Sequence, residues 1–121
     1  MTAQIKDLTH RTCRPCQKGT SPLSLSEAKE YLHQVPDWRL ADNGKSVSRE
    51  FLMKDFVSAV RFMDQVAEVA EAQDHHPDLH VTSYRKLRIE LATHSIGGLS
   101  ENDFILAAKI DQLPKELKKS S

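Results

Sequence analysis

The amino-acid sequence predicts an α+β domain, in which elements in the order α-β-β-α-β-β-α form a two-layer sandwich. Three observations lead to this prediction. The chain has 121 residues, the usual size of one domain. Apolar residues recur with helical spacing in three segments, and short strand-like segments lie between them in pairs. Strand pairs joined by short turns favour a four-stranded antiparallel sheet with helices packed on one face.

Residues 1–23 show no periodicity and are expected to form a flexible N-terminal extension, whereas residues 24–113 are expected to form the domain. The first helix is predicted to begin after Ser24, which forms a capping box with Glu27. Pro36 is expected to end it, because proline lacks an amide hydrogen and restricts the residue before it. The apolar face of this helix is predicted to contain Leu25, Ala28, Leu32 and Val35.

A β-hairpin and a long helix are expected next. Residues 38–40 and 46–51 flank Asn43-Gly44, and Asn-Gly is the strongest short turn signal. Asp55 is then expected to cap a helix that ends near Asp74, because Pro77 disfavours helix just before it. The predicted buried stripe of this helix consists of Phe56, Ala59, Val60, Met63, Val66, Ala67 and Ala70.

Two strands are predicted over residues 80–84 and 87–91. The first is rich in β-branched and aromatic residues, and the second alternates apolar with polar residues. If the second strand continues to His94, this side chain shares the polar face with Arg88 and Glu90.

The last helix is predicted to follow the break at Gly97-Gly98 and to continue to Pro114. Ser100 and Asp103 resemble the capping box that begins such a helix. A cap is the simpler interpretation of Asp103, and it is compatible with a second role in orienting an imidazole. Residues 114–121 are expected to be a polar C-terminal tail.

Charge and hydropathy exclude some classes of function. The chain has 17 basic and 17 acidic side chains, so it has no long-range field toward phosphates or anionic lipid. Direct nucleic-acid binding is therefore not expected. No apolar run approaches the ~18–20 residues of a membrane span. The first seven residues lack an apolar signal core, and a soluble cytoplasmic protein is expected.

Cys13 and Cys16 form a Cys-x-x-Cys pair, with His10 three residues earlier. Such a pair is half of a structural zinc site, or a redox pair where it opens a helix after a strand. The sequence holds no second pair, and no predicted strand precedes this one. We therefore favour two reduced thiols in the extension, with a metal site shared between copies as the alternative.

Histidine is the unusual feature of the sequence, because four of six histidines (His75, His76, His80 and His94) fall within twenty residues. Imidazole exchanges protons near neutral pH. His75 and His76 leave the long helix and His94 precedes a glycine loop, so their side chains could converge on a proton-transfer site. A metal site is less favoured, because adjacent histidines diverge rather than chelate. The remaining interpretation is that these histidines are ordinary exposed polar residues at the ends of helices and strands, and we accept it for His80.

The pattern around these histidines resembles that of the pterin-4a-carbinolamine dehydratases. It comprises Glu71, His75-His76-Pro77, Tyr84, His94 and Asp103 at the spacing of that family. The resemblance implies dehydration of 4a-hydroxytetrahydropterin to quinonoid dihydropterin and water, in recycling of the tetrahydropterin that aromatic amino acid hydroxylases consume. It also implies histidine acid/base catalysis, a pterin dehydratase-like domain over residues 24–113, and a homodimer or homotetramer. No cofactor and no metal are implied.

By position, the resemblance makes His75 and His94 the acid/base pair, and His76 binds the pterin and assists. Which histidine is the acid and which the base stays open. The substrate-binding residues that it implies are His75, His76, Pro77, Thr93, His94, Ser95 and Ile96. Glu71 and Asp103 would support the site.

The family also includes dehydratase-like proteins that act as assembly factors or as dimerisation cofactors of transcription factors. A non-catalytic binding module is therefore the alternative function. The complete set of His75, His76 and His94 favours the enzyme, because binding alone does not require it. Leu79 departs from the aromatic residue of animal members, so the natural pterin stays open.

Overall fold

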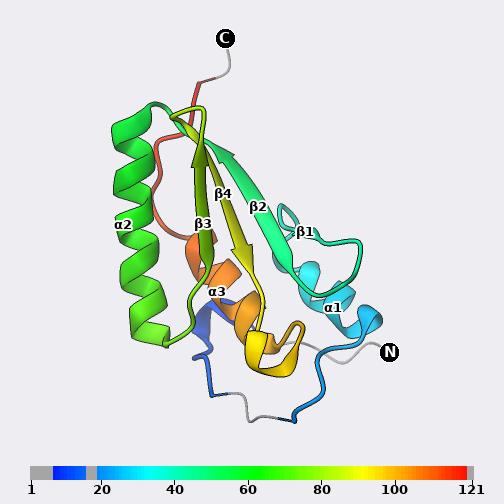
Figure 1. Cartoon of the computed structure of the whole chain (residues 1–121). Coiled ribbons are helices and arrows are strands. Elements are labelled where there is room, and N and C mark those ends of the chain that lie inside the picture. The colour runs from blue at the N-terminus through cyan, green and yellow to red at the C-terminus, as the bar shows by residue number, and fades with distance from the viewer. Residues whose placement is uncertain (1–6, 16–18, 120–121) are drawn as a thin grey trace.

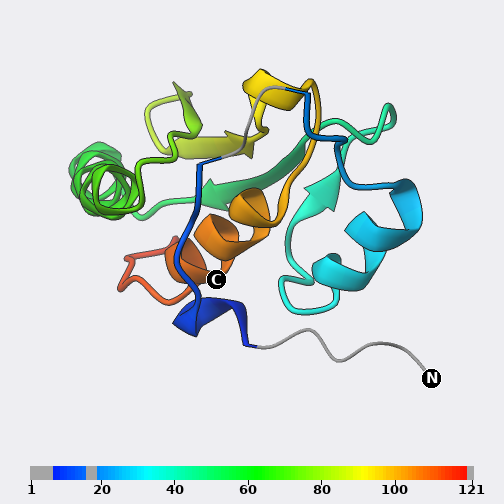
Figure 2. The ribbon, with the colours of Figure 1, turned by 90° about the horizontal axis from the view of Figure 1, so that it is seen from below.

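The computed structural model describes residues 7–15 and 19–119, and within them it contains a four-stranded antiparallel sheet in the order β1-β2-β4-β3. The strands are β1 (Arg39–Leu40), β2 (Val47–Leu52), β3 (Asp78–Thr82) and β4 (Lys86–Leu91). The helices α1 (Leu25–Leu32), α2 (Phe56–Gln73) and α3 (Glu101–Asp111) lie on one side of the sheet (Figures 1 and 2). The predicted α+β sandwich is confirmed.

The first helix begins as predicted but ends earlier. Ser24 Oγ accepts a hydrogen bond from the Glu27 amide at 3.2 Å, and the Glu27 carboxylate accepts one from the Ser24 amide at 2.9 Å. The helix stops at Leu32, and hydrogen-bonded turns lead to Val35, which is buried outside the helix. Leu25, predicted on the buried face, is 55% exposed. The shorter helix buries Ala28 as its contribution to the core.

The hairpin and the ends of α2 follow the local signals. The two strands of the hairpin pair in antiparallel register, and Gly44 in the turn has a φ of 71°, which favours glycine. Asp55 Oδ1 accepts from the Ser58 amide at 2.8 Å and caps α2. Asp74 ends the helix with a φ of 51° in the left-handed region. The chain then leaves the helix at the point where His75 begins.

The buried face of α2 differs from the predicted stripe. Phe56 and Val60 are exposed, whereas Phe62, which the prediction omitted, is buried and packs edge-on against Phe51 of β2. The apolar residues of this helix cover more than one face, so periodicity alone did not choose the face that meets the sheet. The residues that do face the core are Ser58, Ala59, Phe62, Val66 and Ala70.

The sheet has one covered and one open face. Side chains that face the helices are buried, namely Val47, Phe51, Leu87, Ile89 and Leu91. The opposite face carries exposed or half-exposed polar residues, among them Glu50, His80, Lys86, Arg88 and Glu90. This alternation has the period of two expected for an antiparallel sheet covered on one side.

The last two strands and the loop after them depart from the prediction. β3 begins at Asp78, and Tyr84 lies in the turn with a φ of 52° rather than in the strand. β4 ends at Leu91, and His94 starts a short 3-10 helix, η2 (His94–Ile96), instead of continuing the strand. The Thr93 amide donates to the Gly98 carbonyl at 2.8 Å and closes this loop.

Part of the N-terminal segment that was expected to be flexible packs on the domain. A 3-10 helix, η1 (Leu8–His10), lies against α3 on the side away from the sheet (Figure 2). Leu8 has no exposed surface and belongs to the main apolar core. The physical reason is that α3 is apolar on nearly all sides, so the sheet alone cannot cover it.

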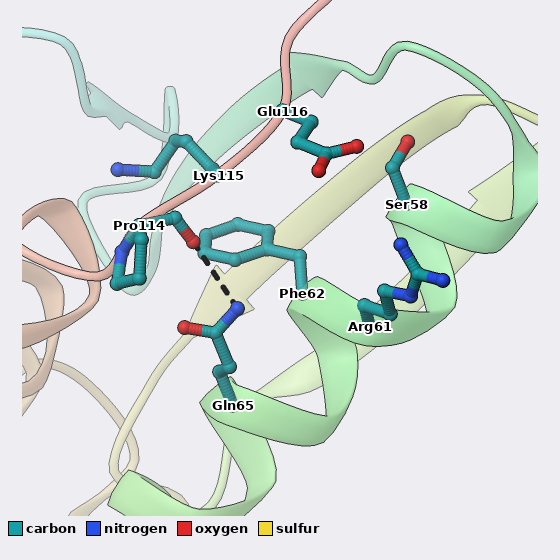
Figure 3. Close-up of a pocket in the computed structure, with 7 residues that line it drawn as sticks. All are labelled: Ser58, Arg61, Phe62, Gln65, Pro114, Lys115 and Glu116. Atoms are coloured by element: carbon teal, nitrogen blue, oxygen red, sulfur yellow. Dashed lines mark hydrogen bonds between the residues drawn. The ribbon is translucent and has the colours of Figure 1, made fainter.

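The segment after α3 also contacts the domain. The Lys54 amide donates to Glu116 O and the Lys118 amide donates to Leu52 O, both at 2.9 Å, so this segment runs beside the end of β2. Gln65 Nε2 of α2 donates to Pro114 O at 3.2 Å, at the rim of a cavity of about 200 Å³ (Figure 3). Across residues 7–15 and 19–119, none of the helices has the length and apolar character needed to cross a membrane.

Candidate functional site

His75 and Asp103 meet where the end of α2 and the start of α3 come together. His75 Nε2 lies 2.6 Å from Asp103 Oδ1, although the residues are 28 positions apart. The Asp103 side chain has no exposed surface, and that of His75 is 12% exposed. A buried carboxylate is costly unless its oxygens accept hydrogen bonds, so the partners of Asp103 decide what the pair can do.

Both oxygens of Asp103 have hydrogen-bond partners, with Oδ1 facing the His75 ring. Oδ2 accepts from Thr93 Oγ1 at 2.8 Å and from the Ser100 amide at 3.0 Å. Thr93 donates its only hydroxyl proton to Asp103. The Ser100 hydroxyl, whose Oγ lies 2.7 Å from Thr93 Oγ1, therefore donates to Thr93. Asp103 therefore caps α3 and contacts an imidazole at the same time, which unites its two sequence-based interpretations.

His76 and Glu71 form a second pair on the surface. His76 Nε2 lies 2.6 Å from Glu71 Oε2, and the two side chains are 58% and 75% exposed. The adjacent imidazoles of His75 and His76 thus have different carboxylate partners. The Glu71 carboxylate thus contacts His76 rather than His75.

His94 lies at a hollow of about 360 Å³ at one end of the sheet. The hollow is lined by Lys45, Ser46, Asp78, Glu90, Ala92, His94, Gly97 and Gly98. Asp78 and Glu90 are cross-strand partners on the open face, so the hollow opens on the side of the sheet that the helices leave uncovered. His94 follows Thr93 directly, and Thr93 bonds to Asp103, which bonds to His75.

The structure brings some predicted site residues together and leaves others apart. Neither His75 nor His76 is among the described residues that line the hollow, and their ring nitrogens bond to Asp103 and Glu71 rather than to His94. Pro77 and Ile96 are half-buried, and Ser95 is exposed. These three flank the histidines along the chain.

Cys13 is half-buried against the core, and Cys16 lies outside the described residues. Within residues 7–15 and 19–119, no group of three or more histidine, cysteine, aspartate or glutamate side chains is arranged to hold a metal ion.

Sequence reasoning missed several residues around the histidines. The Ser100 hydroxyl, Lys45, Asp78 and Glu90 were not singled out for the site. Their proximity depends on strand register and on the loop after β4, which local patterns do not specify. The sequence signals for these residues were the capping pattern of Ser100, the polar face that Glu90 could share with His94, and the position of Asp78 directly after Pro77.

A second polar cluster lies at the start of α3, around Glu101. Glu101 Oε2 accepts hydrogen bonds from Tyr31 Oη at 2.7 Å and from Arg11 Nη1. Burial, together with the bond to Glu101, raises the pKa of Tyr31 to about 12. Burial acts to raise the pKa of Glu101, but the bonds from Tyr31 and Arg11 outweigh it and lower that pKa.

Comparisons with known proteins identify the family of this chain. A family model described as "Pterin 4 alpha carbinolamine dehydratase" matches residues 21–113. A Nitrosomonas europaea protein, provisionally named a pterin-4-alpha-carbinolamine dehydratase, is 48% identical over 112 residues, covering 92% of this chain and 96% of its own. A "transcriptional coactivator/pterin dehydratase" from Brucella melitensis has a TM-score of 0.69 and 37% identity, covering 75% of this chain and 96% of its own.

A more distant structure shares the fold. It is a "pterin dehydratase-like protein" described as a RuBisCO assembly factor in the alpha-carboxysome, with a TM-score of 0.53 and 20% identity over 65% of this chain and 90% of its own. At this identity the likeness shows the fold alone. The family match over residues 21–113 and the 48% identical relative are decisive, and the chain belongs to the pterin-4a-carbinolamine dehydratase family.

Proposed function

We propose that this protein dehydrates 4a-hydroxytetrahydropterin to quinonoid dihydropterin and water by histidine acid/base catalysis. The reaction expels the C4a hydroxyl as water and removes the proton from N5, so it needs one group that donates a proton and one that accepts it. The observation that carries the proposal is the hydrogen bond between His75 and the buried carboxylate of Asp103. Family membership supports it.

Asp103 would set the protonation of the His75 ring. An ionised carboxylate can only accept hydrogen bonds, so the ring nitrogen that faces Asp103, Nε2, would carry a proton. The other nitrogen, Nδ1, is then left to exchange a proton with the substrate. The adjacent carboxylate also stabilises the imidazolium that forms when Nδ1 accepts that proton. His75 is thus oriented for proton transfer at a single nitrogen.

His94 is the proposed partner of His75. The hollow beside it, about 360 Å³, lies within the ~300–1,000 Å³ range of small-molecule sites, which suits one pterin ring. His76, exposed next to Glu71, would bind the pterin and assist. Pro77 and the backbone of residues 93–96 would line the bound ring. The roles of acid and base within the His75/His94 pair stay unassigned.

The proposal extends to the setting of the reaction. The substrate is the product of an aromatic amino acid hydroxylase, so the protein would act in tetrahydropterin recycling in the cytoplasm. It would do so as a homodimer or homotetramer. Exposed Phe56, Val57 and Val60 on α2 support self-association, because they form an apolar strip on one helix. Light scattering coupled to size-exclusion chromatography measures the assembly directly.

The test generates 4a-hydroxytetrahydropterin with a hydroxylase and follows its dehydration by absorbance. Loss of a general acid or base costs ~10²–10⁴-fold, so His75→Ala and His94→Ala should each lower kcat/KM by about that factor. His80→Ala is the matched control, because His80 is an exposed histidine on the open face of β3. If wild type does not exceed the spontaneous rate, the enzyme is excluded and the binding module takes its place.

A further inference from the structure

We propose that the N-terminal strap, defined as residues 8–14, positions the His75–Asp103 pair by linking the end of α2 to the start of α3. The strap precedes residues 21–113, which the family model matches. Figure 2 shows it passing between these two helix ends. The positioning residues are Gln73 and Asn102, which connect the strap to the two helices. The activity readout of this inference rests on the proposed function, and its spectroscopic readout does not.

The first link is to α2. The Cys13 amide donates to Gln73 Oε1 at 2.8 Å. Gln73 is the last residue of α2, and His75 follows two positions later, its own amide donating to Ala70 O at 3.1 Å. The bond from the strap therefore restrains the last turn of the helix that presents the imidazole.

The second link is to α3. The Arg14 amide donates to Asn102 Oδ1 at 3.0 Å, and Asn102 Nδ2 donates back to Arg14 O. The side-chain amide thus pairs with both backbone groups of one strap residue, as a neighbouring strand would. Asn102 is 8% exposed and immediately precedes Asp103. Consecutive strap residues, Cys13 and Arg14, therefore connect the helix end before His75 to the residue before Asp103.

The strap is itself anchored along α3. Leu8 is fully buried in the core, and Lys109 Nζ donates to Thr9 O at 2.9 Å. Arg11 bonds to Glu101, which also accepts from Tyr31 of α1. A segment held at these points cannot slide, so its bonds to Gln73 and Asn102 fix the separation of the two helix ends. Because a displacement of ~1 Å can cost ~10²-fold in rate, such a restraint matters for proton transfer.

The matched pair of variants is Gln73→Leu and Gln65→Leu. Gln65 also bonds a terminal segment, because its Nε2 donates to Pro114 O (Figure 3). It lies on the same helix, about two turns before Gln73. Each variant loses one side-chain hydrogen bond to a terminal segment. Only Gln73→Leu releases the strap from the helix end that carries His75.

Two readouts on the folded full chain separate positioning from general stability. We expect Gln73→Leu to lower kcat at least ~10-fold with KM within about twofold, and Gln65→Leu to leave both near wild type. Long-range ¹H–¹⁵N spectra should show His75 ring signals shifted in Gln73→Leu and unchanged in Gln65→Leu. Gln73→Glu keeps an oxygen that accepts from Cys13, so it should restore kcat toward the wild-type value.

Asn102→Ala breaks the link on the α3 side and replaces Gln73→Leu if that variant does not fold. The proposal is overturned if the His75 signals in Gln73→Leu, or in Asn102→Ala where that variant replaces it, match those of Gln65→Leu. An inactive wild type would refute the proposed function, yet the His75 signals would still test the strap. The two failures are thereby distinguishable.

Discussion

Asp103→Asn is the sharpest perturbation of the candidate site. Asparagine keeps the volume of this fully buried side chain and replaces one acceptor oxygen by a donor NH₂ group. The amide oxygen is required at the Oδ2 position, where the Thr93 hydroxyl and the Ser100 amide both donate. The NH₂ group must therefore take the Oδ1 position, 2.6 Å from His75 Nε2.

This geometry predicts a small loss of stability and a large loss of activity. A hydrogen bond to a charged group contributes roughly 1.5–3 kcal/mol, and a neutral one from the new NH₂ group to Nε2 returns about 1 kcal/mol. We expect a net loss of about 0.5–2 kcal/mol in the free energy of unfolding. The ring proton must move from Nε2 to Nδ1, so Nδ1, the proposed proton acceptor, can no longer accept a proton. Activity should fall ~10²–10⁴-fold.

The assay compares dehydration rates and urea denaturation of Asp103→Asn with those of Asp111→Asn. Asp111 is a second bonded carboxylate on α3, accepting from Trp38 Nε1 at 2.8 Å and from Arg49 Nη1 at 2.7 Å. Both variants should lose stability, but only Asp103→Asn should lose activity and move the ring proton in ¹⁵N spectra. Wild-type turnover by a folded Asp103→Asn would refute the reasoning.

Three further predictions concern stability. The pKa of Glu101 is lowered below 4.5 in the folded chain, so the unfolded chain takes up a proton first as pH falls. The stability that Glu101 contributes should therefore be present above about pH 4.5 and lost as pH falls below it. Glu101→Gln should flatten this decline, measured as the urea midpoint against pH. Leu8→Ala should lower the free energy of unfolding by about 2–5 kcal/mol in urea denaturation, whereas the same change in an unpacked extension would leave it unchanged. Gly98→Ala places a Cβ 2.7 Å from Pro22 Cβ and should cost about 1–3 kcal/mol, seen as a lower Tm; an unchanged Tm would contradict this contact.

Much of the fold was predictable because its signals are local. The caps at Ser24 and Asp55, the turn at Asn43-Gly44 and the end of α2 at Asp74 depend on residues a few positions apart. The burial of Phe62 was not predictable in this way. It depends on how α2 is rotated against the sheet, and an apolar pattern wider than one face allows more than one rotation.

The candidate site, like the fold, was predictable from the sequence only in part. From the sequence alone came the family pattern, the identity of His75, His76, His94 and Asp103 as candidates, and the cap at the start of α3. Only the tertiary structure paired His75 with Asp103, paired His76 with Glu71 and placed His94 at a separate hollow. It also showed that the N-terminal segment contacts both helix ends. These contacts join residues far apart in sequence, so they depend on how the elements pack, which local propensity does not encode.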